Sequence, residues 1–349
     1  MREGLFALVF LSISRPGAGA ELEHVTLAAY ERHVANFGEQ FARQIEGDLF
    51  LEVDEAAGRE LRSGIVIARP GSEDGIISVD EGLIHHWRGA IFIPDATLAD
   101  VLAVAQDFGA YDEIYDWIVD ARLLEHRQNG RSDNYRVLLR IERSAGPVTG
   151  VVDLWTAVSY RYPRAGRAAA LSDADCIRQV ENPGSPDEYR LPPDTGSGYL
   201  WRANTFSKYL ERDGGVYVQV DNIGLSRGFP PLLGWLIEPF ARRLGRGSVT
   251  ESLVRLRNAV ADTSGTRSQE GAASSRLPSP APRSNGPQEC GSGPAEARFP
   301  FAAPGGLTST RSTRLPSMST TSKRNPPRSN TSPVRGTRPS ASIASPPAV

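Results

Sequence analysis

The middle of the chain alternates apolar and polar side chains with a period of two, and no other feature constrains the fold as strongly. In residues 135–142 apolar side chains occupy the odd positions, while Arg136 and Arg140 occupy even ones. Successive side chains of a strand point to opposite faces of a sheet, so this alternation predicts a strand with one apolar face. Strands are expected on similar grounds at residues 82–93, 150–162, 175–181, 199–211 and 215–224.

The segments between these strands predict turns and helices. Turn residues at 192–194 and 213–215 favour an antiparallel arrangement of the strands that they join. In residues 22–47 apolar and aromatic side chains recur at a spacing of three to four, which is typical of a helix that packs along one side. Two shorter helices are expected, one capped near Thr97 and one at residues 111–119.

The C-terminal part of the folded region is predicted to be helical. Residues 230–242 are apolar, and Ser248 with Glu251 matches a capping box that would begin a last helix ending near Val260. The order of elements predicts an α+β fold, in which an antiparallel sheet carries helices on one side. A twisted sheet of about six or seven strands can curve around such a helix. The space between them would hold either packed core or a cavity.

Four short motifs support a resemblance. They are Gly-Leu-Ile-His-His-Trp at 82–87, Tyr-Leu-Trp-Arg at 199–202, Gly-Gly-Val-Tyr at 214–217 and Leu-Ser-Arg at 225–227. With the order of elements, they resemble an uncharacterised bacterial family of the START/Bet v 1-like (SRPBCC) superfamily over roughly residues 24–260. The resemblance implies a helix-grip fold, a curved antiparallel sheet around a C-terminal helix, here with an extra N-terminal helix. The superfamily includes lipid carriers, polyketide cyclases and oxygenase domains, so it implies a cavity and not a reaction.

Both ends of the chain differ from the body. Residues 1–20 contain Arg2, an apolar run at 5–13 and Ala18-Gly19-Ala20, a pattern typical of a secretory signal peptide. We therefore expect a secreted or periplasmic protein, or a cytoplasmic one if this segment is not a signal. An N-terminal helical extension is expected at residues 21–75 and the helix-grip domain at residues 76–260.

Residues 261–349 predict a disordered low-complexity tail. They hold 14 of the 26 prolines and a net charge of about +7, and they have too few apolar residues to form a core. One interpretation is a secreted stalk or a basic arm. The other is a frameshift product, because two lysines against 37 arginines suggest GC-rich coding, and a shifted frame through such DNA yields this composition.

Charge and cysteine content exclude several functions. Residues 21–260 carry a net charge of about −10, which would repel a phosphate backbone, so the folded domain is not expected to bind nucleic acid. Cys176 and Cys290 are the only cysteines, which excludes a disulfide framework and a Cys₄ or Cys₂His₂ zinc site. Cys176 is expected to be a buried, unreactive thiol. The N-terminal apolar run is shorter than the roughly 20 residues of a transmembrane span.

Adjacent His85 and His86 are the most conspicuous polar residues of the predicted sheet. On one strand they point to opposite faces, so they cannot jointly chelate a metal ion, and one of them is expected to face the interior. No His-x-x-x-His or His-Glu-x-x-His pattern occurs, and neither a nucleophile elbow nor a phosphate-binding loop is present. We therefore expect no metal, no cofactor and no assigned catalytic residue.

Several other residues could contact a ligand. Asp153 shares a strand face with Trp155 and becomes a head-group anchor if that face is concave. Arg202 and Arg227 could bind a ligand carboxylate, or could form structural ion pairs with the acidic body. The aromatic residues could line a pocket or form ordinary core. The candidate ligand-binding residues are His85, His86, Trp87, Asp153, Trp155, Tyr160, Trp201, Arg202, Tyr217, Arg227 and Trp235.

Three functions remain open from the sequence. The first is non-enzymatic binding or carriage of an apolar small molecule or lipid between the sheet and the C-terminal helix. The second is a cyclase- or aldolase-type enzyme acting on polyketide-like substrates, which requires an acid or base inside the cavity. The third is a structural or interaction protein of the cell envelope, whose core is filled by its own side chains.

Overall fold

The computed structural model describes residues 20–72, 74–129, 132–145, 148–228, 234–269 and Cys290. All of them belong to one compact unit, Met1–Phe301, and a second unit, Ala302–Val349, lies outside the described residues. Of the predicted signal peptide, residues 1–20, the structure describes only Ala20. No described helix is long and apolar enough to cross a bilayer.

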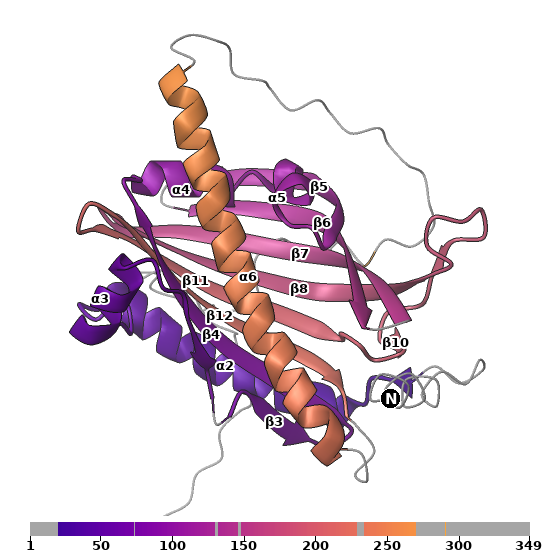
Figure 1. Cartoon of the computed structure of the whole chain (residues 1–349). Coiled ribbons are helices and arrows are strands. Elements are labelled where there is room, and N and C mark those ends of the chain that lie inside the picture. The colour runs from indigo at the N-terminus through magenta and orange to yellow at the C-terminus, as the bar shows by residue number, and fades with distance from the viewer. Residues whose placement is uncertain are drawn as a thin grey trace, which may run out of the picture. The chain divides into compact units, whose positions relative to one another are not determined.

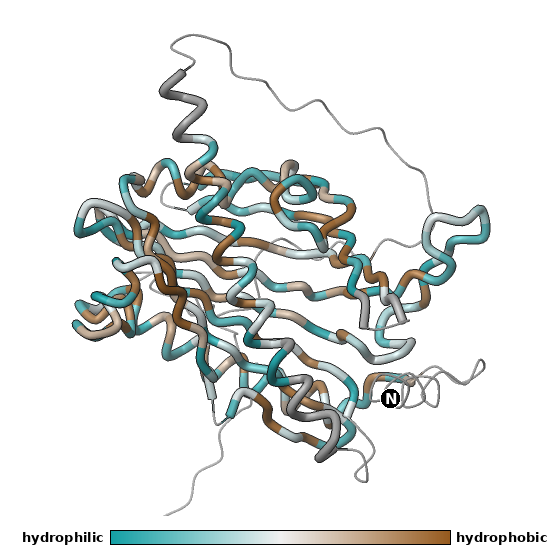
Figure 2. Tube along the Cα trace, in the orientation of Figure 1, coloured by the Kyte–Doolittle hydropathy of each residue, from teal (hydrophilic) through white to brown (hydrophobic). Residues whose placement is uncertain are grey.

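Ten strands form one antiparallel sheet (Figure 1). Eight of them follow the order β2-β4-β12-β11-β8-β7-β6-β5, while β3 pairs with β4 and β9 with β8. The strands are β2 (Ile67–Pro70), β3 (Ile76–Val79), β4 (Gly82–Pro94), β5 (Ile118–Asn129), β6 (Ser132–Ala145), β7 (Val148–Arg164), β8 (Arg167–Glu181), β9 (Tyr189–Arg190), β11 (Arg202–Arg212) and β12 (Gly215–Arg227). Hydropathy alternates along several of them, as the period of two predicted (Figure 2).

The remaining elements are mostly helical. They are α2 (His24–Glu46), α3 (Glu55–Arg62), α4 (Leu98–Ala105), the 3₁₀ turn η1 (Phe108–Ala110), α5 (Tyr111–Ile114) and α6 (Gly234–Gln269). A capping box at Thr97 and Asp100 begins α4, as predicted. A second, two-stranded sheet joins β1 (Ala20–Glu21) to β10 (Thr195–Gly196) and so attaches the start of α2 to the body.

Two helices cover opposite faces of the large sheet. Val249 and Leu253 of α6 pack in one core cluster with Ile91 and Tyr209, whose side chains point to what we call the α6 face. The buried side of α2 packs in a different cluster. Its partners on the opposite face of the sheet, the α2 face, include Ile84, Leu171, Phe206 and Ile223. The α+β helix-grip architecture is thus confirmed, but the expectation that helices cover only one side is wrong, because α2 has its own apolar sheet face to bury.

The structure differs from the prediction at three places in α6 and the strands. Helix α6 is continuous through Ser248, whose carbonyl accepts a hydrogen bond from the Ser252 hydroxyl within the helix, so no capping box begins there. The helix also continues to Gln269, past the expected tail boundary at residue 261. Residues 118–129, predicted only as the end of a short helix, form the edge strand β5.

One further expectation needs correction. Cys176 is not a free thiol, because it forms a disulfide with Cys290 across a sequence separation of 114. Strand β2, which precedes the predicted domain boundary at residues 75 and 76, pairs with β4. The rest of the predicted disordered tail, apart from Cys290, lies outside the described residues.

Candidate functional site

One end of the α6 face is closely packed. Val249, Leu253, Leu256 and Val260 are buried against the sheet and against α4. Nearer the start of the helix, the indole of Trp87 meets Gly245, where an added Cβ would lie 2.4 Å from Trp87 Nε1. Glycine is therefore required at this close approach, and Trp87 lies between the sheet and α6.

Beyond this packing, the α6 face has a floor of small side chains. The strand register places Thr156, Ala174, Ala203, Gly224 and His85 side by side across five strands. The neighbouring row contains small polar residues, and we call both rows together the floor. The second row comprises Ser172, Thr205 and Asn222.

The floor is not fully covered. Ala203, Gly224 and His85 are only half-buried, as are the polar residues of the second row, although the sheet continues on both sides of them. Small side chains leave more room above a sheet than Leu or Phe. Leu200 takes up part of that room, because it packs in the same cluster as Ala203 and its Cδ1 would lie 3.6 Å from a Cβ at Gly224. The rest of the floor is less covered than the packed end.

A buried hydroxyl without a partner borders the floor. Thr156 is 4% exposed, and its Oγ1 has no hydrogen-bond partner among the described residues. A buried polar atom left unpaired costs free energy, so natural structures usually satisfy such atoms with protein, water or ligand. The apolar side chains of Val152, Leu154 and Ile177 lie beside it on the same face. An apolar wall with one free hydroxyl suits a mostly apolar molecule that carries a polar group.

His85 supplies a second polar group at the opposite end of the row. Its Nε2 lies 2.8 Å from the Ser226 hydroxyl oxygen. Burial lowers the pKa of His85 to about 4, so the imidazole is neutral at physiological pH. A neutral imidazole can donate or accept a hydrogen bond, but it is a weak base.

The α2 face holds a different kind of polar cluster, in which nearly every group has a partner. Lys208, Gln219 and Asp221 are each 1% exposed, and His86 and Arg88 are buried beside them. Asp221 accepts hydrogen bonds from Arg88 Nε at 2.7 Å and from His86 at 3.2 Å. Although burial alone would raise it, these two partners hold the pKa of Asp221 below its usual value.

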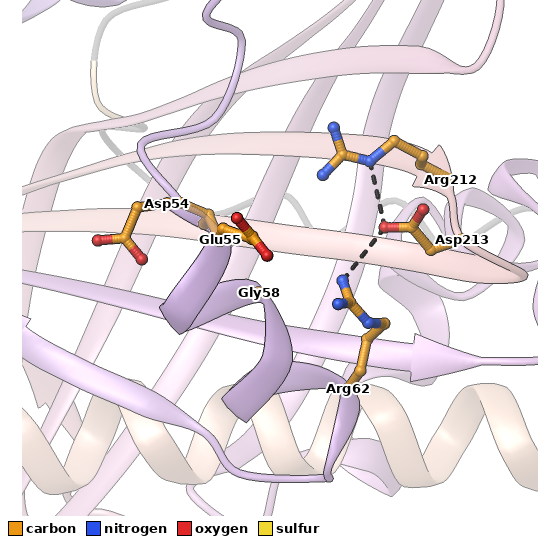
Figure 3. A pocket seen from close by; sticks show the side chains of 7 residues that line it. Asp54, Glu55, Gly58, Arg62, Arg212 and Asp213 are labelled. Carbon is orange, nitrogen blue, oxygen red and sulfur yellow. Dashed lines mark hydrogen bonds and ion pairs between the residues drawn. The ribbon is translucent and has the colours of Figure 1, made fainter.

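A surface pocket of about 740 Å³ lies between α3 and the hairpin of β11 and β12. In Figure 3, Arg62 and Arg212 both approach Asp213, while Asp54 and Glu55 lie on the other side. The Tyr217 hydroxyl donates to Asp213 at 2.8 Å, and this bond, aided by both guanidinium groups, lowers the pKa of Asp213. The pocket is polar and its charges are already paired, so it does not suit an apolar ligand.

The residues predicted as ligand contacts do not meet at one place. His85, Trp87 and Tyr160 point to the α6 face, where the Tyr160 hydroxyl donates to the Ala105 carbonyl at 2.8 Å. By the register, His86, Asp153, Trp155 and Tyr217 point to the other face. The face that carries Asp153 and Trp155 is therefore the one turned away from α6, and Asp153 does not face the grip.

Asp153 and its neighbours form ion pairs instead. Arg140 donates to both carboxylate oxygens of Asp153 at 2.7 and 3.0 Å, and Arg190 donates to it as well. The Arg190 guanidinium carbon also lies 5.6 Å from the centre of the Trp155 ring. Asp153 is thus held in ion pairs with two arginines that the sequence analysis did not single out.

The remaining predicted residues lie elsewhere. Trp201 belongs to the cluster under α2, and Arg202 forms an ion pair with Asp194 at 2.6 Å. Arg227 is exposed, and the side chain of Trp235 is outside the described part of the chain. Contact of any of these residues with a ligand stays a prediction.

Sequence reasoning missed Thr156 and Lys208. Thr156 gave no signal, because threonine is common in strands and its missing partner is visible only in three dimensions. Lys208 did give one: it is the only lysine outside the tail, and it occupies a strand position whose neighbours two residues away, Phe206 and Leu210, are apolar.

Comparison with known proteins gives matches among solved structures alone. No family model matches the chain, and no curated protein sequence matches it. A STAR-related lipid transfer protein from Xanthomonas axonopodis is similar at 18% identity and a TM-score of 0.33, covering 54% of this chain and 99% of that one.

Two further structures show the same level of likeness. Human StAR-related lipid transfer protein 5 has 13% identity and a TM-score of 0.35, covering 66% of this chain and 99% of that one. The Zhui aromatase/cyclase from Streptomyces sp. R1128 has 14% identity and a TM-score of 0.31, covering 53% and 96%. The helix-grip arrangement expected from the sequence is seen in the chain's own antiparallel sheet and α6.

Proposed function

We propose that the protein binds a small, mostly apolar molecule, a lipid included, against the floor of its α6 face. One observation carries the proposal: the buried Thr156 hydroxyl has no hydrogen-bond partner in the described part of the chain, and it borders a floor that is only partly buried. An apolar ligand placed there would leave water at about 25 cal/mol per Å² of apolar surface. A hydrogen bond from its polar group to Thr156 would add about 1 kcal/mol.

The polar groups favour binding over acid–base catalysis. Of the acid–base residues predicted from the sequence, only His85 points to the α6 face. Its lowered pKa of about 4 makes it a poor general base at neutral pH, where a catalytic group works best with a pKa near the operating pH. His86 and Asp153 lie on the opposite face in structural pairs. The cyclase reading therefore lacks a matched acid or base.

The filled-core reading fits only one end of the grip. Val249, Leu253, Leu256 and Val260, on one side of α6, are buried in the main core cluster. The half-buried floor and the unpaired hydroxyl lie outside that packing. We therefore infer that the protein's own side chains close one end and a ligand occupies the other.

Binding can be tested on the full chain. The protein is purified without detergent, examined by native mass spectrometry and extracted with organic solvent, and then titrated with 1-anilinonaphthalene-8-sulfonate as an apolar fluorescent probe. We expect a copurified apolar compound or saturable probe binding. Ala203→Phe, which fills the floor, should weaken binding at least tenfold, whereas Arg212→Ala, in the pocket beside α3, should leave it unchanged.

The opposite pattern would overturn the proposal. An empty protein that does not bind the probe, or probe binding that Ala203→Phe leaves intact, excludes the floor as the site. Thr156→Val should weaken the binding of an extracted ligand that has a polar group by about 1 kcal/mol, or roughly fivefold. Loss of binding in Arg212→Ala would move the site to α3.

We also propose that the protein is exported. A disulfide between Cys176 and Cys290 persists in an oxidising compartment, which supports the reading of residues 1–20 as a signal. N-terminal sequencing of the protein from periplasmic and cytoplasmic fractions tests this. A mature chain beginning near Glu21 in the exported fraction is expected, and an intact Met1 in the cytoplasm would contradict it.

A further inference from the structure

The cluster between α2 and the sheet joins ionisable groups from five parts of the chain. Helix α2 contributes His33 and Gln44, and the segment after it contributes Glu52. The sheet supplies a second set of groups from β4, β11 and β12. These are His86 and Arg88, then Lys208, then Gln219 and Asp221. We call all eight residues the α2 network.

Two imidazoles and a carboxylate form a chain from the helix into the sheet. His33 Nε2 lies 3.2 Å from His86 Nδ1, and His86 Nε2 lies 3.2 Å from Asp221 Oδ1. If His86 donates its Nε2–H to Asp221, its Nδ1 accepts a hydrogen bond from the Nε2–H of neutral His33. The chain is thus complete with both histidines neutral, and an additional proton would have to bind His33 Nδ1, which would put a positive charge next to His86.

The second part of the network also connects α2 to the sheet. Lys208 Nζ donates to Gln44 Oε1 on the helix, and Gln44 in turn donates to Glu52. Arg88 bridges Glu52 and Asp221. The backbone nitrogen of Glu52 donates to Gln219 Oε1 at 3.0 Å, so the segment after α2 is held as well.

The charges of the network are close to balance at neutral pH. Arg88 and Lys208 face the carboxylates of Asp221 and Glu52, with Arg69 of β2 donating to the Glu52 carbonyl. Burial lowers the pKa of Lys208 to about 8, while Asp221 and Glu52 act in the opposite direction. Burial and the neighbouring His86 lower the pKa of His33 to about 4. Added positive charge is therefore unfavourable while α2 is docked.

We propose that the α2 network is a pH-sensitive clasp, and that acidification releases α2 from the sheet, because a proton on His33 adds positive charge directly beside His86, in a network that already holds Arg88 and Lys208. Release would expose the aromatic side chains that α2 buries against the sheet, among them Phe37 and Phe41. The device lies on the face opposite the proposed ligand floor and does not depend on it.

The direction and size of the pH effect on α2 docking follow from the difference in the His33 pKa between the docked and the released helix. A histidine whose pKa falls from 6.5 when free to about 4 when docked stabilises docking above pH 6.5, and this stabilisation is lost as the pH falls toward 4. At pH 5, His33 would be protonated in most molecules whose α2 is released and in few molecules whose α2 is docked. The docking equilibrium constant should therefore be about 30-fold smaller at pH 5 than at pH 8.

Hydrogen–deuterium exchange of the full chain measures this directly. Protection factors, corrected for the intrinsic pH dependence of exchange, are compared at pH 8 and pH 5. We expect protection of the α2 amides to fall about 30-fold, while that of β11 and β12 changes much less. His33→Gln keeps a hydrogen-bonding group without a titrating one, so its α2 amides should lose little protection at pH 5.

Matched controls make the outcome decisive. His24→Gln changes an exposed histidine in the first turn of the same helix and should behave like the unaltered chain. If His33→Gln does not keep α2 docked at pH 8, the pH profile of the unaltered chain decides alone. Equal α2 protection at both pH values, a parallel loss in β11 and β12, or an unchanged pH response in a docked His33→Gln would overturn the proposal.

Discussion

The two faces of this sheet differ in how their polar groups are satisfied. Under α2, Asp221, Lys208 and Gln219 are buried and hydrogen-bonded to partners from the helix, the following segment and adjacent strands. Under α6, Thr156 is also buried, but its hydroxyl has no partner among the residues that the structure describes, and the floor beside it is only partly buried. The polar groups under α2 are thus satisfied by the chain, whereas the Thr156 hydroxyl can still form a hydrogen bond.

This difference is the reason why we place the proposed ligand on the α6 face. Removing any member of a paired buried cluster costs free energy, so such a cluster fixes the position of a helix. A buried hydroxyl without a partner has the opposite property, because a molecule that forms a hydrogen bond with it lowers the free energy of the site. The same α+β sheet thus has one face that holds a helix in place and one that we propose binds a ligand.

The largest change in stability is expected from a substitution in the packed core between α2 and the sheet. Phe41 is fully buried, with its ring 5.1 Å from that of Phe206. Phe41→Ala should lower the free energy of unfolding by about 3–5 kcal/mol, because the chain cannot fill the space left by the ring. Urea denaturation followed by circular dichroism measures this. Leu49→Ala, at a position 83% exposed, is the control and should change stability by less than about 0.5 kcal/mol.

A smaller effect is expected at the contact between Trp87 and α6. Gly245→Ala would place a methyl group 2.4 Å from Trp87 Nε1 and should destabilise the protein by about 1–3 kcal/mol. Gly247→Ala changes the same helix where nothing lies within 4 Å, and it should stabilise by up to about 1 kcal/mol through helix propensity. Melting curves of both variants compare them. If both variants were more stable than the unaltered protein, α6 would not pack on Trp87 at Gly245.

The smallest expected effects come from two substitutions that each remove one hydroxyl, one from each face of the sheet. They compare the two faces most directly. The Tyr30 hydroxyl on α2 lies 2.7 Å from Asn204 Oδ1, so Tyr30→Phe should cost about 1–2 kcal/mol. Thr156→Val removes a hydroxyl that has no partner, so without ligand it should be neutral or stabilising by up to about 1 kcal/mol. Chemical denaturation of the ligand-free proteins reports both signs. A clear loss in Thr156→Val would show that its hydroxyl is already satisfied.

The sequence predicted the strands well where one face is apolar. Residues 135–142 and 215–224 alternate cleanly, and both lie inside observed strands. Strand β5 escaped prediction because charged side chains such as Arg122 and Glu125 occur along it, as is usual at an exposed sheet edge. Its register shifts near Leu123 disturb the period as well.

Other features depend on contacts between distant residues and have no local signal. Pro239, Gly245 and Gly247 suggest an interrupted helix, yet α6 is continuous, because its buried side packs on the sheet and Gly245 accommodates Trp87. The alternation of side chains along the strand showed that Asp153 and Val152 point to opposite faces of the sheet, but not which of these faces is covered by α6. The face that each helix covers depends on how α2 and α6 pack on the sheet, and the hydrophobic periodicity of a strand does not contain that information.

The bond between Cys176 and Cys290 turns part of the chain into a covalent ring. The ring contains the end of β8, the strands β9 to β12 and the whole of α6. Closing a loop of about 100 residues lowers the conformational entropy of the unfolded chain, which stabilises the folded protein by roughly 4–5 kcal/mol in the entropic model. A protease that cut once between Gln269 and Cys290 would therefore leave a nicked protein whose two pieces separate only after reduction.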